Sequence, residues 1–326
     1  RSVTWCIAGS TGKAEMEAAP GARVLPAWSW RLLPALLACL AAPAFFVLRV
    51  SWVGWVLLAA ALVTAWALER TSVRVDAAGT GAAAVASGTG PRVSHAELTG
   101  TAAAHPREPS LLRDLSLIAL GLLVVSVIPL HAELDNLAFV RFGLALGGAV
   151  LLPYLVSRFV YRDHAIRFPW RGGGRWTAFQ WSWLGTVLVL GWLILPFYFI
   201  TSGVYTNWPV VDTPEMIGRL FVGVGAVGIW DELFFICIVF ALLRRHFPMW
   251  QANILQMIVF VSFLWELGYQ AWGPLLTIPF AMLQGFIFMK TRSLAYVVTV
   301  HLLFDAVVFL VLVHAHNPGL LDIFLV

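Results

Sequence analysis

Two short stretches place ionisable side chains within apolar surroundings: residues 228–235 (GIWDELFF) and residues 301–305 (HLLFD). The apolar runs that contain them are long enough to span a membrane. There an ionised side chain costs about 3 kcal/mol or more unless it faces a bundle interior or a wet cavity. The candidate site residues are therefore Asp231, Glu232, His301 and Asp305.

The composition of the whole chain agrees with a membrane location. Of 326 residues, 60% are hydrophobic and 12% are charged, and the mean hydropathy is +0.84. These values exclude an ordinary soluble domain and a disordered chain, and they predict an all-α, polytopic integral membrane bundle in a lipid bilayer. The net charge of +4 does not indicate a nucleic-acid partner, because basic residues in such a protein first set topology. Cys6, Cys39 and Cys237 are too scattered for a disulfide framework.

Nine apolar runs are long enough to cross a hydrocarbon core about 30 Å thick. They cover residues 28–48, 50–68, 115–130, 137–159, 181–200, 216–243, 251–267, 272–289 and 294–313. This pattern divides the chain into an N-terminal segment with a two-helix hairpin (1–68), a polar linker (69–114), three further helices (115–200) and a C-terminal core (201–326). The chain begins at Arg1, so the first residues are expected to be either a fragment edge or an upstream misread, and Met16 is a candidate for the true start.

Basic residues predict the orientation of these helices, because cytoplasmic loops hold most Lys and Arg. With the N-terminus inside, the basic residues fall in inner segments except for Arg49 in an outer loop and for Arg141 and Arg219 near outer helix ends. We therefore expect the N-terminus inside, the C-terminus outside, and a location in a bacterial cytoplasmic membrane.

Helical geometry brings the candidate residues to similar depths. Asp231 and Glu232 lie about 100° apart around one helix and can edge one crevice, and His301 and Asp305 share a helix face. At 1.5 Å per residue, Glu232 lies ~16 Å and His301 ~11 Å from the inner boundary. We therefore expect the crevice to open toward the cytoplasm. Gly225 and Gly228, one to two turns before Glu232, predict close approach of another helix.

A buried carboxylate pair beside an imidazole can perform general acid–base catalysis, for example by activating water against a peptide carbonyl. Three other interpretations stay open. The four residues can form a structural polar knot between helices. Asp231, Glu232 and His301 can hold a divalent metal such as zinc. An acidic crevice can also serve a proton-coupled or cation-coupled transporter, although helices broken by paired Gly or Pro are missing.

Several stretches resemble motifs of the CAAX protease and bacteriocin-processing (CPBP) family of intramembrane peptidases. Residues 231–236 (DELFFI) resemble its Glu-Glu-x-x-x-Arg motif, and residues 252–260 (ANILQMIVF) are similar to the start of its Phe-x-x-x-His motif. Residues 285–294 (GFIFMKTRSL), followed by residues 301–305, are similar to its last motif, which ends in His-x-x-x-Asn. The resemblance covers about residues 216–313.

The resemblance implies a helical membrane enzyme that cleaves peptides near the membrane surface. In that family the first glutamate activates water, histidines and an asparagine bind the intermediate, and the need for a metal is open. Carried onto this chain, Asp231 takes the base position, Glu232 the second acid, His301 the histidine and Asp305 the asparagine position.

Four positions depart from the family pattern. Asp231 is one methylene shorter than glutamate, Ile236 replaces the arginine, Leu264 stands at a histidine position, and Asp305 stands at an asparagine position. Three acids with at most one imidazolium concentrate negative charge that demands protons or a cation. Glu266 is a candidate substitute for the missing histidine, and simple interfacial solvation is the competing interpretation.

The sequence therefore predicts an intramembrane endopeptidase, a hydrolase that cleaves a membrane protein or peptide by carboxylate-activated water. The alternative is a catalytically degenerate CPBP member that binds a substrate or assists a partner peptidase, for example in protein sorting or bacteriocin tolerance.

Overall fold

The computed structural model describes residues 29–86, 109–172, 174–321 and 323–324, and this part of the chain is helical with no strand. In chain order the helices are α1 (Leu32–Ala42) with π-helical η1 (Pro43–Val47), α2 (Ser51–Ala86), α3 (Leu111–Ser126), α4 (Asn136–Leu155) with π-helical η2 (Val156–Tyr161), α5 (Ala178–Thr201), the short η3 (Val204–Asn207), α6 (Pro214–Asp231) with π-helical η4 (Glu232–Phe240) and α7 (Ala241–Leu243), α8 (Met249–Leu267), α9 (Pro274–Thr291) and α10 (Leu294–His316). The prediction of an all-α membrane protein is confirmed.

Each of the nine predicted runs overlaps a helix, but the count of nine membrane spans is not confirmed. Within the described residues, six helices are long and apolar enough to cross a membrane. The first run corresponds to a shorter apolar helix, Leu32–Val47. The third corresponds to α3, which has 16 residues. The seventh corresponds to α8, which buries the polar side chains of Gln251, Asn253, Gln256 and Glu266.

The predicted polar linker is helical over its first part, because α2 continues to Ala86. Its alanine-rich sequence favours a helix. Residues 87–108 lie outside the described residues, as do Cys6 and Met16. Helix starts elsewhere follow side-chain caps: Ser110, Asp135, Thr177, Thr213 and Ser293 each accept a hydrogen bond from a backbone N–H in the first turn.

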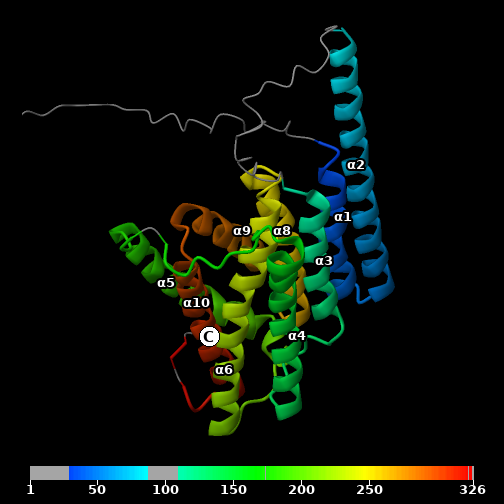
Figure 1. Cartoon of the computed structure of the whole chain (residues 1–326). Coiled ribbons are helices and arrows are strands. Elements are labelled where there is room, and N and C mark those ends of the chain that lie inside the picture. Colours follow the sequence, from blue (N-terminus) through cyan, green and yellow to red (C-terminus); the bar gives the residue numbers. More distant parts are fainter. Residues whose placement is uncertain (1–28, 87–108, 173, 322, 325–326) are drawn as a thin grey trace, which may run out of the picture.

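The continuous helix Pro214–Leu243, formed by α6, η4 and α7, occupies the centre of the bundle. It contacts α3, α4, α8, α9 and α10. Figure 1 shows the α1–α2 pair on one side of this centre and α5 with α10 on the other. The central helix therefore presents its side chains to the interior over much of its length, which reduces the cost of ionisable residues there.

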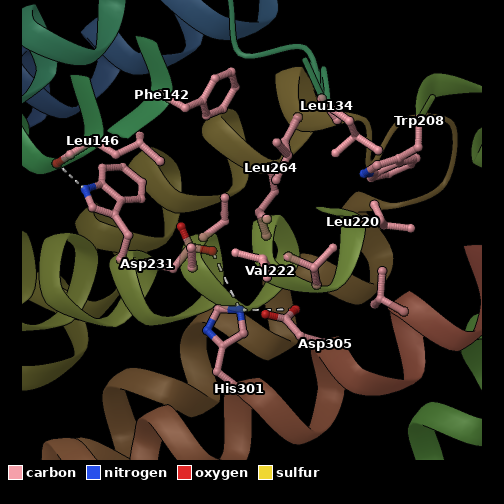
Figure 2. A pocket seen from close by; sticks show the side chains of 18 of the residues that line it. Leu134, Phe142, Leu146, Trp208, Leu220, Val222, Asp231, Leu264, His301 and Asp305 are labelled. Carbon is pink, nitrogen blue, oxygen red and sulfur yellow. Dashed lines mark hydrogen bonds and ion pairs between the residues drawn. The ribbon is translucent and has the colours of Figure 1, made fainter. Parts of the chain in front are cut away.

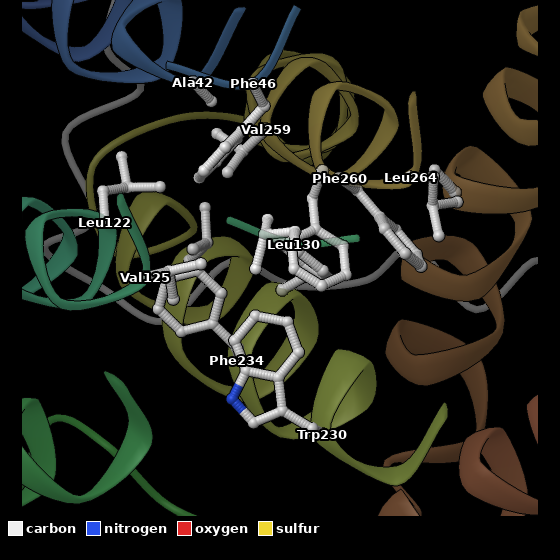
Figure 3. Packing of buried hydrophobic residues seen from close by; sticks show 14 of the residues in the cluster. Ala42, Phe46, Leu122, Val125, Leu130, Trp230, Phe234, Val259, Phe260 and Leu264 are labelled. Atoms are coloured by element: carbon white, nitrogen blue, oxygen red, sulfur yellow. The ribbon is translucent and has the colours of Figure 1, made fainter. Parts of the chain in front are cut away.

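Aromatic packing fixes the part of the central helix that carries the two acids. Trp230 stacks on Phe234 at a centroid distance of 5.1 Å, and Phe235 stacks on Phe260 of α8 at 4.4 Å. Figure 3 shows this cluster between the α1–η1 segment, α3 and α8. In a bilayer such contacts stabilise by dispersion and close packing rather than by removal from water. Asp231 and Glu232 are thus held by a dense apolar wall.

Candidate functional site

All four predicted site residues meet in one buried cluster. His301 Nδ1 lies 2.8 Å from Glu232 Oε1, and His301 Nε2 lies 3.6 Å from Asp231 Oδ2 and 3.7 Å from Asp305 Oδ1. Each of the four residues has a relative exposure of 6% or less. The imidazole therefore bridges the acids of the central helix and the acid on its own helix, α10.

The close approach predicted at Gly228 is confirmed. A Cβ atom at this position would lie 2.0 Å from Asp305 Oδ2 and 3.5 Å from His301 Cδ2. A larger side chain there would have to displace the Asp305 carboxylate. Gly228 therefore sets the spacing at which His301 reaches the two acids of the central helix.

The two neighbouring acids of the central helix have different surroundings. Asp231 ends the α-helical part and lines a cavity, whereas Glu232 begins the π-helical part and does not line it. Glu232 Oε1 accepts hydrogen bonds from Gln284 Nε2 at 2.6 Å and from His301 Nδ1 at 2.8 Å. The expectation that both acids edge one crevice thus holds for Asp231 alone, because Glu232 lies behind the imidazole.

Negative charge is concentrated in this cluster. Among the described residues, no Lys or Arg forms a salt bridge with Asp231, Glu232 or Asp305, and His301 is the group that contacts all three. Asp231 Oδ1 and Glu232 Oε2 are buried and make no hydrogen bond to the protein. Burial of carboxylates without cationic partners is costly, and these two oxygens are the ones that the cluster leaves without a partner.

A cavity of about 370 Å³ lies against this cluster, between α4 and the first half of the central helix. Figure 2 shows Asp231, His301 and Asp305 at one wall and Phe142 and Leu146 of α4 at another. Trp230 Nε1 donates to the carbonyl oxygen of Leu146 at 2.7 Å and ties the two helices together there. The other lining side chains are mostly apolar.

The cavity reaches the lateral surface of the bundle. Its wall includes Gly143 and Gly147 of α4 and Val222 and Ala226 of α6, and all four residues are exposed. Val222 has a relative exposure of 57%. The cavity that contains Asp231 is therefore bordered by exposed residues between α4 and α6.

The predicted direction of opening is wrong under the orientation used for it. The cavity extends toward Leu134 and Trp208, in connections that the topology prediction places outside. Toward the other end, Cys237, Leu294 and Val297 are completely buried and close the site. Depth along a helix gives a distance from each boundary, but neighbouring side chains decide which end is open.

The structure shows where two of the residues that depart from the family pattern lie. Leu264, at the histidine position, lines the cavity with a relative exposure of 6%. Ile236, at the arginine position, is completely buried. Glu266 does not line the cavity and accepts a hydrogen bond from the backbone of Leu130. The structure therefore does not bring Glu266 to the site as a substitute for histidine.

Sequence reasoning missed Tyr269, which lines the same cavity as Asp231 and Asp305. Thr277 and Trp230 also line it, but the Thr277 hydroxyl donates to Gly273 O and the Trp230 indole to Leu146 O. The Tyr269 hydroxyl carries no such bond within the described part of the chain. A polar aromatic residue directly after Gly268, between two apolar helices, is the signal that could have identified it.

Asp231, Glu232 and His301 have the right ligand atoms for a divalent metal, but their side chains are not arranged to bind one. Carboxylates and imidazole are common zinc ligands. However, His301 turns Nδ1 to Glu232 and Nε2 to Asp231, so these three side chains do not converge on one point. Within the described residues, no group of three or more His, Cys, Asp or Glu side chains is placed to hold an ion. The arrangement does not fit the zinc site considered from the sequence.

Comparison with known proteins supports the resemblance found in the motifs. Residues 213–307 match the family described as "Type II CAAX prenyl endopeptidase Rce1-like". No curated protein and no solved structure matches the chain. The matched segment starts at the cap of α6 and ends within α10, so it contains all four clustered residues. Residues 213–307, less than half of the chain, are therefore similar to an Rce1-like domain, which is consistent with the resemblance of the motifs to the CPBP family.

Proposed function

We propose that the protein is an intramembrane endopeptidase that hydrolyses a peptide bond in a membrane protein or membrane-bound peptide. The single observation that carries this proposal is the common wall formed by Asp231, His301 and Asp305 in a largely apolar cavity. The Rce1-like match covers these residues and supports the same reaction class.

The nucleophile in this proposal is a water molecule between Asp231 Oδ2 and His301 Nε2. These atoms are 3.6 Å apart, which exceeds a normal hydrogen bond but lets one oxygen bond both at about 2.8 Å. Asp231 Oδ1 has no hydrogen bond to the protein, so this carboxylate has capacity to accept a proton. The position at the cavity wall gives the water access to a substrate carbonyl.

Glu232 acts as a positioning residue. An ionised carboxylate can only accept hydrogen bonds, so His301 donates Nδ1–H to Glu232 Oε1 and turns Nε2 to the cavity. Gln284 holds the same oxygen from the opposite side. This pairing corresponds to the way a buried carboxylate fixes the tautomer of a catalytic histidine.

The proposed reaction has two steps, attack of water on the carbonyl carbon and cleavage of the C–N bond, and each proton is accounted for. Asp231 removes a proton from water as the water oxygen bonds to the carbonyl carbon, which gives a tetrahedral oxyanion. The proton then passes to His301 Nε2 and from there to the peptide nitrogen as the C–N bond breaks. The products are a carboxylic acid and an amine, and Asp231 is again free to accept a proton.

Tyr269 is the proposed donor to the oxyanion. The family pattern uses histidine and asparagine to bind the intermediate, but this chain has Leu264 and Asp305 at those positions. Tyr269 lines the same cavity as Asp231 and Asp305, and its hydroxyl forms no hydrogen bond to another group within the described residues. A preorganised donor of this kind stabilises the charge that develops on the oxygen.

A second candidate function rests on the substitutions at these positions. Leu264 puts an alkyl side chain into the cavity wall where the family has histidine. A member without that imidazole can retain the cavity and bind a substrate for a partner peptidase, for instance in protein sorting or bacteriocin tolerance. For both candidates we propose a location in a bacterial cytoplasmic membrane with the N-terminus inside.

Substitution of the clustered residues separates these two functions. Membrane proteins are compared in cells with the wild type, Asp231→Asn, Glu232→Gln or His301→Gln at matched expression. For a peptidase, processing that depends on the protein stops with Asp231→Asn and His301→Gln. Processing that needs the protein but not these side chains supports the scaffold function, and processing unaffected by the protein contradicts both.

A further inference from the structure

The two ends of the bundle are each joined by hydrogen bonds between their loops. At one end, Arg245 binds Asp114 and Asp163, and Leu294 N donates to Pro169 O. This end, called the basic end, holds the described residues Arg31, Arg70, Arg113, Arg158, Arg162, Arg167, Arg171, Arg175, Arg244, Arg245, Lys290 and Arg292. It contains most of the positive charge of the described chain.

The opposite end has its own set of loop contacts. Arg219 Nη1 donates to Leu134 O at 2.9 Å, Asn207 Nδ2 to Gly268 O at 2.9 Å, and Asn317 Nδ2 to Val211 O at 2.7 Å. Its described basic residues are Arg49, Arg141 and Arg219, and its acids include Glu133, Asp135, Asp212 and Glu215. We call it the acidic end.

The cavity runs from the clustered acids to the acidic end. Its wall includes Ala132, Glu133 and Leu134 before α4, Trp208 before α6, and Tyr269 before α9. All these residues lie in connections at that end. Toward the basic end, the apolar cluster of Cys237, Leu294, Val297 and Val298 closes the site. The cavity thus extends from Asp231 and Asp305 toward the acidic end, whereas most of the positive charge lies at the basic end.

Charge asymmetry predicts how this bundle sits in a bilayer. Lys and Arg concentrate in cytoplasmic loops, so the basic end faces the cytoplasm. The acidic end, with the mouth of the cavity, then faces away from the cytoplasm.

We infer that the substrate reaches Asp231 from the non-cytoplasmic face of the membrane. This inference rests on the proposed peptidase function. The substrate class is a membrane-anchored protein whose scissile segment lies at the non-cytoplasmic end of its apolar span. The span lies beside Val222 and Ala226 at the lateral opening between α4 and α6, while the adjoining segment enters beside the exposed Glu133 at the acidic end.

Cysteine labelling in intact cells tests the orientation without a substrate. Single cysteines are introduced as Glu133→Cys at the cavity mouth and Arg175→Cys at the basic end, in full-length protein with Cys6, Cys39 and Cys237 replaced by alanine. A membrane-impermeant maleimide should label Glu133→Cys in intact cells and Arg175→Cys only after permeabilisation, with at least about a tenfold contrast. The reverse pattern overturns the inference, as does equal labelling of both.

Mapping of new protein termini tests the substrate class. Membrane proteins from cells with wild type or Asp231→Asn are compared at matched expression. Termini that need Asp231 should lie at the non-cytoplasmic ends of membrane spans, and termini at cytoplasmic ends overturn the inference. If no terminus depends on Asp231, the proposed peptidase function is wrong, and the proposed substrate class is wrong with it. The labelling result is independent of this outcome and still shows which face of the membrane the cavity opens to.

Discussion

The protein contains two buried histidine–carboxylate pairs that look alike in isolation. His301 lies 2.8 Å from Glu232, and His246 lies 2.6 Å from Asp114. Both histidines have a relative exposure of 4% or less. The pairs differ in what surrounds them, because Arg245 adds a cation to the Asp114 pair at 2.7 Å, whereas the His301 cluster contains further acids.

The difference separates a structural ion pair from a candidate active site. The Asp114 cluster joins the start of α3 to the end of α7, contains the cation Arg245 and lines none of the described cavities. The His301 cluster has three acids around one imidazole and opens to a cavity. A short contact between histidine and carboxylate is therefore weak evidence for catalysis, whereas uncompensated charge beside accessible space is stronger evidence.

The largest expected effect is on Asp231. Asp231→Asn removes the proton acceptor and retains the size of the side chain, so cleavage should fall by about 10²–10⁴-fold. The measurement is the initial rate of substrate cleavage by purified protein in liposomes.

His246→Gln is the matched variant in the other pair. It should lower the unfolding free energy by about 1–3 kcal/mol, because Asp114 loses a buried partner, and leave cleavage per folded molecule unchanged. Equal losses of activity in both variants would remove the distinction between the two pairs.

The next largest expected effect is a fall in kcat when Tyr269 loses its hydroxyl. Tyr269→Phe removes the hydroxyl and keeps the ring, which packs edge-on against Trp208 at 5.3 Å. We expect kcat to fall by about 10²-fold with little change in KM, because an oxyanion donor acts in the transition state. A normal kcat would assign Tyr269 to packing alone.

A smaller effect should follow from loss of the support behind the imidazole. Gln284→Leu removes the hydrogen bond to Glu232 and should lower kcat by about tenfold, which is the rate equivalent of 1.4 kcal/mol. Gln256→Leu is the control, since its amide donates to Ala281 O at 2.8 Å and not to a site acid. If both variants lose activity in proportion to stability, Gln284 has no specific role.

The smallest expected effect is on the pH dependence of folding stability, through Asp163 at the basic end. Burial raises the pKa of Asp163, but hydrogen bonds from Ser157 and Ala165 and the charge of Arg245 outweigh it, and the net pKa is lower than usual. A lowered folded-state pKa stabilises the protein above the unfolded pKa of about 3.9, and this stability is lost as pH falls through the folded value.

Asp163→Asn should therefore lower the thermal midpoint at pH 7 by no more than about 2 °C, consistent with less than about 1 kcal/mol for a partly exposed pair. The difference from wild type should shrink below pH 4. A difference that stays constant from pH 7 to pH 3 would exclude this charge interaction.

The helices and the meeting of the four residues could be predicted from sequence for physical reasons. Long apolar runs have few alternatives to a helix in a bilayer, and Gly228 marked where α10 comes close. The role of Glu232 could not be predicted, because a change from α-helix to π-helix at that residue leaves no trace in the hydrophobic pattern. Likewise, the direction of the cavity depends on whether Cys237 and Val297 pack tightly, which spacing does not reveal.

The lateral opening between α4 and α6 also exposes the cavity to the lipid or detergent that surrounds the bundle. Because exposed Gly143 and Val222 belong to the cavity wall, we expect acyl chains to reach the space in which the proposed peptide substrate would bind. Detergent tails have the same access during purification. Inhibition constants measured in micelles will therefore reflect competition with the detergent, and the length of its tail becomes part of the binding equilibrium.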